Sequence, residues 1–231
     1  MYLSRLIPDT TSHAFRRDHG DLQHMHRTVM SGFPDITEDI PARTHHSVLW
    51  RLDPSHAGYT LYVQSRTYPD WAHLNDYLAH PSEVRDLSGA LDAVQPGRTL
   101  AFRVQANPVK RLRLQDQRDP SRQGGRRDNR YPILSQGDQI SWLINQGSRH
   151  GFIIPAGSDG RPDVAVTPSP RHTGRQNGDR GSHKLTVDSV RFDGHLVVTD
   201  ADALAEALTH GIGPAKAYGC GLLTLAPPQR T

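Results

Sequence analysis

The sequence predicts an α+β protein built from two similar units in tandem, and three observations support this. Alternation of apolar and polar residues marks several short strands, while apolar residues at helical spacing mark helices between them. The order strand, helix, strand, strand, helix, strand fits the first part of the chain, and a similar order follows. Pro96 and Gly97 separate the two parts. We therefore expect two tandem ferredoxin-like (RRM-like, β-α-β-β-α-β) domains, at residues 1–95 and 96–231.

The first unit opens with a short apolar strand over residues 2–7. Asp21 is a helix N-cap residue, and it predicts a helix from Leu22 that Gly32 and Pro34 end. Asp53, Pro54 and Gly58 indicate a hairpin turn between two strands. The remaining elements expected are strands at 47–52 and 59–67, a second helix at 70–78 and a closing strand at 83–87.

The second unit repeats the pattern with more strands. Helices are expected over 136–146 and after Asp200, and strands over 99–105, 152–154, 164–167, 185–192, 196–198 and 222–226. The strands at 164–167 and 185–192 flank a segment rich in glycine and basic residues. This is the pattern of a long β-hairpin with a charged tip.

Composition limits the class of protein. The chain has 231 residues, 35% of them hydrophobic, which is enough for one large or two small cores. Cys220 is the single cysteine, so no disulfide can form within the chain. With no signal peptide and no long apolar run, we expect a cytoplasmic protein that does not enter a membrane.

A glycine-rich segment near the C-terminus predicts a site for a polyanion. Gly211, Gly213, Gly219 and Gly221 surround Lys216. Glycine admits positive φ and lets a phosphate approach the backbone amides, while the lysine supplies charge. A helix precedes the segment and a strand follows it, the reverse of dinucleotide and Walker loops. A helix C-cap followed by a turn is the alternative, and it leaves the last two glycines unexplained.

Two basic segments point to nucleic acid, although the net charge is only +3. Residues 110–130, which begin with Lys110 and Arg111, carry eight basic residues and three acids. Such a flexible segment can order on a phosphate backbone, or it can be a solvated loop. The expected hairpin tip carries Arg171, Arg175 and Lys184. It can enter a groove or brace a helical end of a nucleic acid, or be an ordinary disordered tip.

The fourteen histidines form no metal-binding spacing, so we expect neither a metal nor a cofactor. Histidine suits acid–base chemistry instead. Cleavage of RNA without a metal needs a base for the 2′-OH, an acid for the leaving 5′ oxygen and a cation near the phosphate. His26 lies on the first expected helix beside Arg27, and it is our candidate for this chemistry.

Several motifs in the right order resemble one family. They are Met1–Ser4 in the form Met-Tyr-Leu-Ser, Met25-His26-Arg27, Phe33-Pro34, Phe102-Arg103-Val104-Gln105-Ala106-Asn107-Pro108-Val109-Lys110, and Gly211-Ile212-Gly213-Pro214-Ala215-Lys216 leading to Gly219-Cys220-Gly221-Leu222-Leu223. The chain resembles the CasE family, the CRISPR-associated endoribonuclease subunit of the subtype I-E Cascade complex.

The resemblance implies metal-independent cleavage of precursor CRISPR RNA at the 3′ base of the repeat stem-loop. It implies products with a 2′,3′-cyclic or 3′ phosphate and a 5′ hydroxyl, retained by the protein with other Cascade subunits. His26 matches the family's catalytic histidine, and Arg27 matches a position that contacts RNA. Segment 171–184 takes the place of an arm that holds the stem.

One position departs from the family. Relatives often carry a tyrosine three residues before the catalytic histidine, where this chain has Gln23. Tyr2, His24 and Lys216 are the substitutes considered. Two other classes of function stay open from the residues alone: a module that binds an RNA stem-loop without cutting it, and a ferredoxin-like metabolite regulator.

Overall fold

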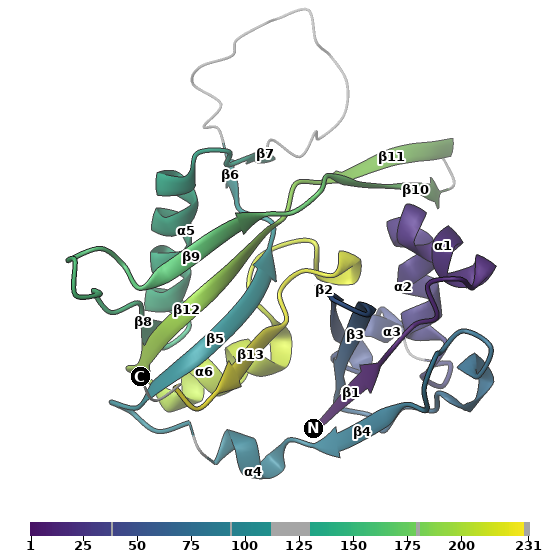
Figure 1. The fold of residues 1–231 in the computed structure, drawn as a ribbon, viewed down its shortest axis with the longest axis horizontal. Coiled ribbons are helices and arrows are strands. Elements are labelled where there is room, and N and C mark those ends of the chain that lie inside the picture. Colours follow the sequence, from purple (N-terminus) through teal and green to yellow (C-terminus); the bar gives the residue numbers. More distant parts are fainter. Residues whose placement is uncertain (38, 93, 112–129, 179–180, 229–231) are drawn as a thin grey trace, which may run out of the picture.

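Two antiparallel sheets, one from each part of the chain, lie beside each other in the computed structural model (Figure 1). The structure describes residues 1–231 except 38, 93, 112–129, 179–180 and 229–231. Most of the basic segment 110–130 therefore lies outside the described residues. In the described part, no helix is long and apolar enough to cross a membrane.

The first sheet has the strand order β2-β3-β1-β4. Its strands are β1 (Tyr2–Leu6), β2 (Leu49–Ser55), β3 (Gly58–Ser65) and β4 (Glu83–Asp86). Helices α1 (His13–Gly20) and α2 (Leu22–Met30) pack on it through a core that includes Phe15, Met25 and Val63. This strand order is the ferredoxin-like one, so the expected fold class is confirmed for this unit.

Two local predictions for this unit were wrong, and three helices were not predicted. The expected helix at 70–78 is one 3₁₀ turn, η1 (Ala72–Leu74). Trp71, Leu74 and Tyr77 are all buried, and their three-residue spacing matches the three residues per turn of a 3₁₀ helix. Strand β2 continues through Pro54, which an edge strand tolerates. The short helices α3 (Ala42–His45) and α4 (Ser88–Leu91), together with α1, were not predicted.

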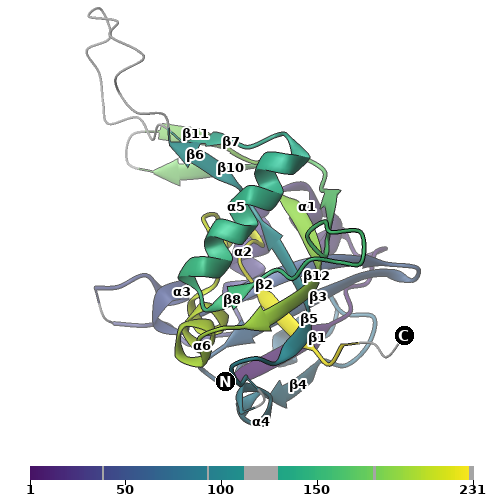
Figure 2. The ribbon, with the colours of Figure 1, turned by 90° about the vertical axis from the view of Figure 1, so that its left-hand side faces the viewer.

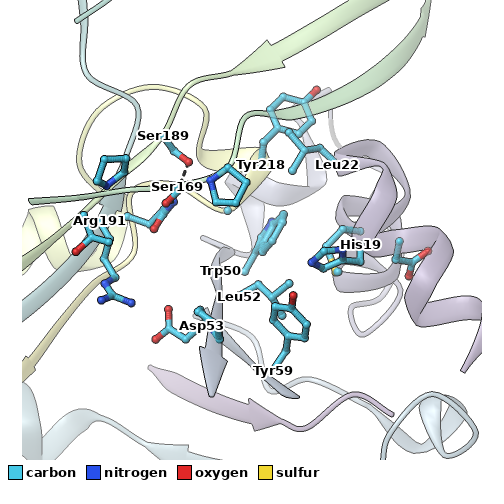
Figure 3. A pocket seen from close by; sticks show the side chains of 18 residues that line it. His19, Leu22, Trp50, Leu52, Asp53, Tyr59, Ser169, Ser189, Arg191 and Tyr218 are labelled. Carbon is cyan, nitrogen blue, oxygen red and sulfur yellow. Dashed lines mark hydrogen bonds between the residues drawn. The ribbon is translucent and has the colours of Figure 1, made fainter. Parts of the chain in front are cut away.

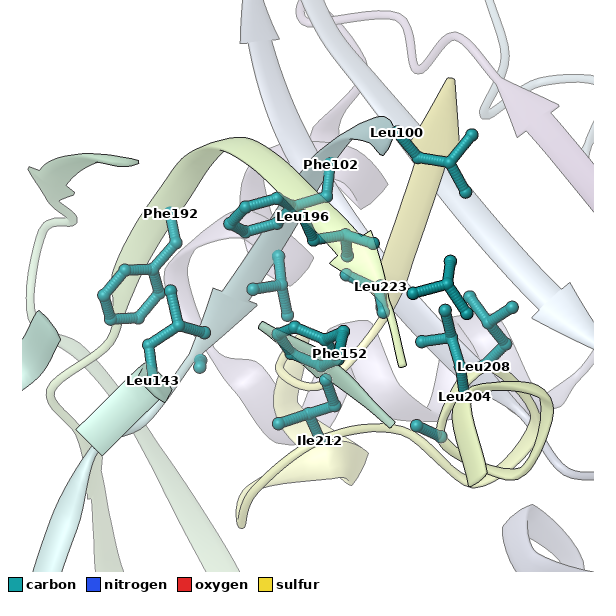
Figure 4. Packing of buried hydrophobic residues seen from close by; sticks show 14 of the residues in the cluster. Leu100, Phe102, Leu143, Phe152, Phe192, Leu196, Leu204, Leu208, Ile212 and Leu223 are labelled. Atoms are coloured by element: carbon teal, nitrogen blue, oxygen red, sulfur yellow. The ribbon is translucent and has the colours of Figure 1, made fainter. Parts of the chain in front are cut away.

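The second sheet has the order β13-β5-β12-β8, with β9 also paired to β12. Its strands are β5 (Thr99–Ala106), β8 (Phe152–Ile153), β9 (Val164–Pro168), β12 (Val190–Val198) and β13 (Leu223–Ala226). Helices α5 (Gln136–Arg149) and α6 (Ala201–His210) cover one face over a core that includes Phe152, Phe192 and Leu204 (Figure 4). The order again is ferredoxin-like, with the second strand divided between β8 and β9. The division between residues 95 and 96 stays our proposal.

The long hairpin is formed by two strand pairs in succession. Strand β9 pairs with β12, and β10 (His172–Gly178) pairs with β11 (Gly181–Val187) beyond the sheet. The strand expected at 185–192 is therefore interrupted at Asp188 and Ser189. The β10–β11 arm projects over α1 and α2 of the first unit, and β6 (Val109–Arg111) pairs with β7 (Arg130–Pro132) nearby (Figures 1 and 2).

Candidate active site

Helix α2 holds His26 at the junction of the two units. The Asp21 side chain caps this helix by accepting a hydrogen bond from the Gln23 amide at 2.8 Å. Leu22, Met25 and Val29 form the buried face, which leaves His26 at its edge. The His26 ring lies edge-on to the Tyr218 ring with centroids 6.1 Å apart. The imidazole and the glycine-rich segment, far apart in sequence, therefore meet in space.

A tryptophan from the first unit fixes the glycine-rich loop of the second. The 3₁₀ turn η3 (Lys216–Tyr218) lies between Ala215 and Gly219, both in the left-handed region. Trp50 Nε1 donates a hydrogen bond to the Ala217 carbonyl at 3.1 Å. Its ring covers Gly219 so closely that a Cβ there would lie 2.9 Å from it. Strand β2 thus sets where Lys216 and Tyr218 lie.

The other glycines in this loop serve mainly its own packing. Gly211, Gly213 and Gly221 have φ values of +77°, +76° and +92°. The Gly211 amide donates to the carbonyl of Ala207, as in a helix C-cap, and the Gly221 amide donates to that of Gln105. Both amides are therefore satisfied within the protein, and these two glycines help to shape the loop. A phosphate contact at any of the four glycines stays a prediction.

Burial and positive charge act together on His26. Its pKa is lowered from 6.5 by desolvation first, then by the Arg43 and Arg27 cations, while the Ala217 carbonyl acts in the opposite direction. Nδ1 is buried and has no hydrogen-bond partner among the described residues. The imidazole is therefore mostly neutral at pH 7, the form that accepts a proton.

Arg43 affects the pKa values of both His26 and Lys216. Burial lowers the pKa of the Lys216 ammonium, and the Arg43 guanidinium lowers it further. Because the same guanidinium also lowers the pKa of His26, it lies within electrostatic range of both groups. Such a concentration of positive charge favours an anion between the groups. Arg43 lies in α3, inside a polar loop with no motif, so no sequence signal identified it.

Tyr218 lies next to Gln23. Its hydroxyl donates to Gln23 Oε1 at 3.4 Å, and burial raises its pKa. Among the substitutes considered, Lys216 shares a neighbour with His26, whereas Tyr2 packs edge-on against Tyr68. His24 is two residues before His26 and so lies on a different side of the helix. Sequence reasoning missed Tyr218, for which an aromatic residue inside the glycine segment was the available signal.

The predicted RNA-binding residues lie on several elements of the fold. Arg27 is exposed beside His26, and Lys110 and Arg111 are exposed on β6. Arg171 pairs with Asp188 at 2.6 Å, close to where the arm leaves the sheet. Arg175 and Lys184 are opposite each other in the β10–β11 register, but their side chains lie outside the described part of the structure.

The arm reaches the start of helix α2. Gly174 is buried, and a Cβ on it would lie 3.2 Å from Asp21 Oδ1 and 3.4 Å from the Gln23 amide. The backbone of β10 therefore packs against the first turn of α2. This contact places the basic arm on the same side of the molecule as His26.

Between the two sheets lies a cavity of about 270 Å³, and Trp50 and Tyr218 line it together (Figure 3). Its polar lining includes Ser169, Ser189 and Arg191. Within the residues that the structure describes, no group of three His, Cys, Asp or Glu side chains could hold a metal ion.

The fold and this arrangement define a known class of protein. The family model described as “CRISPR associated protein” matches residues 1–227, and the chain belongs to this family. It is 30% identical over 231 residues to CRISPR-associated endoribonuclease Cse3 of Thermus thermophilus, covering 98% of this chain and 100% of that protein. It is also 30% identical over 195 residues to CRISPR system Cascade subunit CasE of Escherichia coli, covering 79% and 90%. The expected resemblance to CasE is confirmed.

Solved structures agree with the fold. Cse3 bound to a 19-nucleotide RNA matches with a TM-score of 0.76 at 29% identity, over 98% of this chain and 100% of that one. The CRISPR-associated protein Cas6e of Escherichia coli matches with a TM-score of 0.66 at 26% identity, over 99% and 100%. Both comparisons span both sheets of the present protein.

Proposed function

We propose that this protein is a metal-independent endoribonuclease that cleaves precursor CRISPR RNA at the 3′ base of the repeat stem-loop. The meeting of His26 with Lys216 and Arg43 carries the proposal, because it supplies a neutral base beside cations. The relatives support it: Cse3 is named an endoribonuclease, and one of its structures is described as representing a pre-cleavage RNA complex. CasE is named a Cascade subunit, so we also propose that the product stays bound within such a complex.

The proposed reaction needs only side chains of this chain. His26 removes the proton from the 2′-OH, and the 2′ oxygen attacks the adjacent phosphorus. The P–O5′ bond breaks as the 2′-O–P bond forms, which leaves a 2′,3′-cyclic phosphate that can open to a 3′ phosphate. Lys216 stabilises the extra negative charge of the transition state and donates a proton to the departing 5′ oxygen. The reaction leaves a 5′ hydroxyl on the product, a protonated His26 and a neutral Lys216. Proton exchange with solvent then restores neutral His26 and protonated Lys216.

The RNA contacts surround this centre. We propose that Arg27 holds the backbone next to the cut, and that Lys110, Arg111, Arg171, Arg175 and Lys184 hold the stem. Gly213 and Gly219 border the phosphate at Lys216. The stem would be recognised through shape and backbone, because the deep, narrow major groove of A-form RNA excludes side chains.

A stem-loop binding subunit that does not cut is the alternative, and Gln23 favours it because glutamine has no acidic proton to transfer. Incubation of a repeat stem-loop RNA with the protein in EDTA separates the two. If the protein is a nuclease, cleavage should proceed in EDTA and disappear in His26→Ala while RNA binding persists. Binding without cleavage in the parental protein would establish the alternative.

A further inference from the structure

A second pocket shares the Tyr218 side chain with the cavity between the two sheets. Its volume is about 300 Å³, and it is open to solvent. Three segments that are distant in sequence line it: the β6–β7 pair, the base of the β10–β11 arm and the glycine-rich loop. Its lining includes Asn107, Pro132, Thr186, Asp188, Pro214 and Tyr218.

The pocket is next to the proposed reaction centre. Tyr218 forms one of its walls, and the same ring lies 6.1 Å from the His26 ring, centroid to centroid. Asn107, which lines the pocket, follows the end of β5. Two residues before it, the Gln105 carbonyl accepts a hydrogen bond from the Gly221 amide at 2.7 Å, which joins this strand to the glycine-rich loop. A group bound in this pocket therefore belongs to a nucleotide adjacent to the linkage at His26.

The lining chemistry fits a nucleobase better than a phosphate. Tyr218 supplies an aromatic ring, and Pro132, Pro214 and Ala215 supply apolar surface, which suits a flat base. The Asp188 carboxylate, whose side chain is 23% exposed, is paired with Arg171, and Arg130 also lines the pocket, so the aromatic and apolar walls, and not the charge, favour a base. Asp188 Oδ1 accepts from Arg171, which leaves Oδ2 as an acceptor for an amino group.

Asn107 gives the pocket a donor and an acceptor. No hydrogen bond joins its side chain to another described residue, although it follows the buried Ala106 at the end of β5. An asparagine amide pairs in two places with adenine, and a carboxylate accepts from exocyclic amino groups. Uracil has no amino group, and it would offer the Asp188 carboxylate only a ring N3–H that lies between two carbonyl oxygens.

We propose that this pocket binds one unpaired nucleobase carrying an exocyclic amino group, adenine above all, next to the cleaved linkage. The inference rests on the proposed function and assigns a role to the Ala106-Asn107-Pro108 motif. The pocket would hold the RNA strand in register, so that the correct linkage reaches His26.

The test uses a repeat stem-loop whose cut site carries a 2′-deoxy nucleotide, so that binding is measured without cleavage. Each unpaired nucleotide flanking the cut is replaced in turn by an abasic one. We expect one position to lose about thirtyfold in affinity, the middle of the range for a stacked base. Asn107→Ala should reduce this loss, because it removes a hydrogen-bond partner of the base and leaves the Tyr218 ring in place, whereas Asn145→Ala, on the exposed side of α5, should leave it unchanged.

A change in base preference at the sensitive position provides the second measurement. Asp188→Asn replaces an acceptor with an amide that can also donate, so uracil at the sensitive position should be tolerated better than by the parental protein. If no abasic position weakens binding more in the parental protein than in Asn107→Ala, the pocket is not a base site, even though stem binding and cleavage persist. If the parental protein neither binds nor cuts the RNA, both this inference and the proposed function fail.

Discussion

Gly219→Ala tests whether the contact between Trp50 and the glycine-rich loop organises the reaction centre. The residue has a φ of +78°, which costs an alanine about 1–2 kcal/mol. The new Cβ would lie 2.9 Å and 3.1 Å from two ring carbons of Trp50, and such overpacking costs about another 1–3 kcal/mol. We therefore expect a total loss of about 2–5 kcal/mol in the free energy of unfolding.

Gly97→Ala is the matched control for this prediction. Gly97 has a φ of +80°, and nothing lies within 4 Å of a Cβ built on it. Its substitution should cost only the backbone contribution, about 1–2 kcal/mol. Urea unfolding of both variants and the parental protein gives the difference, which isolates the contact with Trp50.

The same variant should lose cleavage more than binding. A displaced Trp50 ring weakens the 3.1 Å hydrogen bond to Ala217 and shifts Lys216 and Tyr218 away from His26. Misplacement by about 1 Å can lower a rate about a hundredfold. Single-turnover cleavage should therefore fall by at least about tenfold, while RNA affinity changes little. Equal unfolding energies for Gly219→Ala and Gly97→Ala, or cleavage at the parental rate, would refute this reasoning.

Four other outcomes are expected. His26→Ala should lower single-turnover cleavage by about 10²–10⁴-fold with RNA affinity unchanged, and parental cleavage would remove His26 from the mechanism. Because folding lowers the pKa of His26 below 6.5, cleavage should increase with pH below that value and be level near pH 7; Arg43→Met should shift this increase to higher pH. Substitution of both Lys110 and Arg111 by alanine should reduce the salt dependence of log K by about 0.7–0.9 for each phosphate that these two side chains neutralise, measured by RNA binding at several salt concentrations. Burial raises the pKa of Cys220 to about 12, so a thiol reagent should label it only after unfolding, and rapid labelling of the native protein would contradict its position.

Strands with one buried face could be predicted from the alternation of apolar and polar residues. Alternation along β5 puts Phe102 and Val104 into the core, and the sequence pattern alone identifies this strand to within one residue. Helix α6 was predicted from apolar residues at helical spacing after Asp200, among them Leu204 and Leu208, which are buried. Local chemistry specified these elements, so local reasoning was sufficient.

Elements that depend on tertiary contacts could not be predicted in this way. The 3₁₀ turn at Ala72–Leu74 exists because Trp71 donates a hydrogen bond to Ser4 at 2.9 Å, across 67 residues of chain. The glycine segment was identified, but the sequence did not show that Leu49, Trp142 and Trp50 lie against Gly211, Gly213 and Gly219. A sequence pattern shows that a close approach occurs there, and only the fold shows which group approaches.

The candidate site depends on how the two units are joined, and charged groups fix that arrangement. Arg51 is 3% exposed, pairs with Asp53 at 2.8 Å and donates to the carbonyls of Arg103 and Leu222 in the second unit, each at 3.2 Å. Arg103 in turn pairs with Asp53 at 3.3 Å. Removing one member of a buried pair leaves the other charge uncompensated, so rotation between the units is costly. His26 and Lys216 come from different units, and this network therefore helps to preserve the distance that the proposed reaction requires.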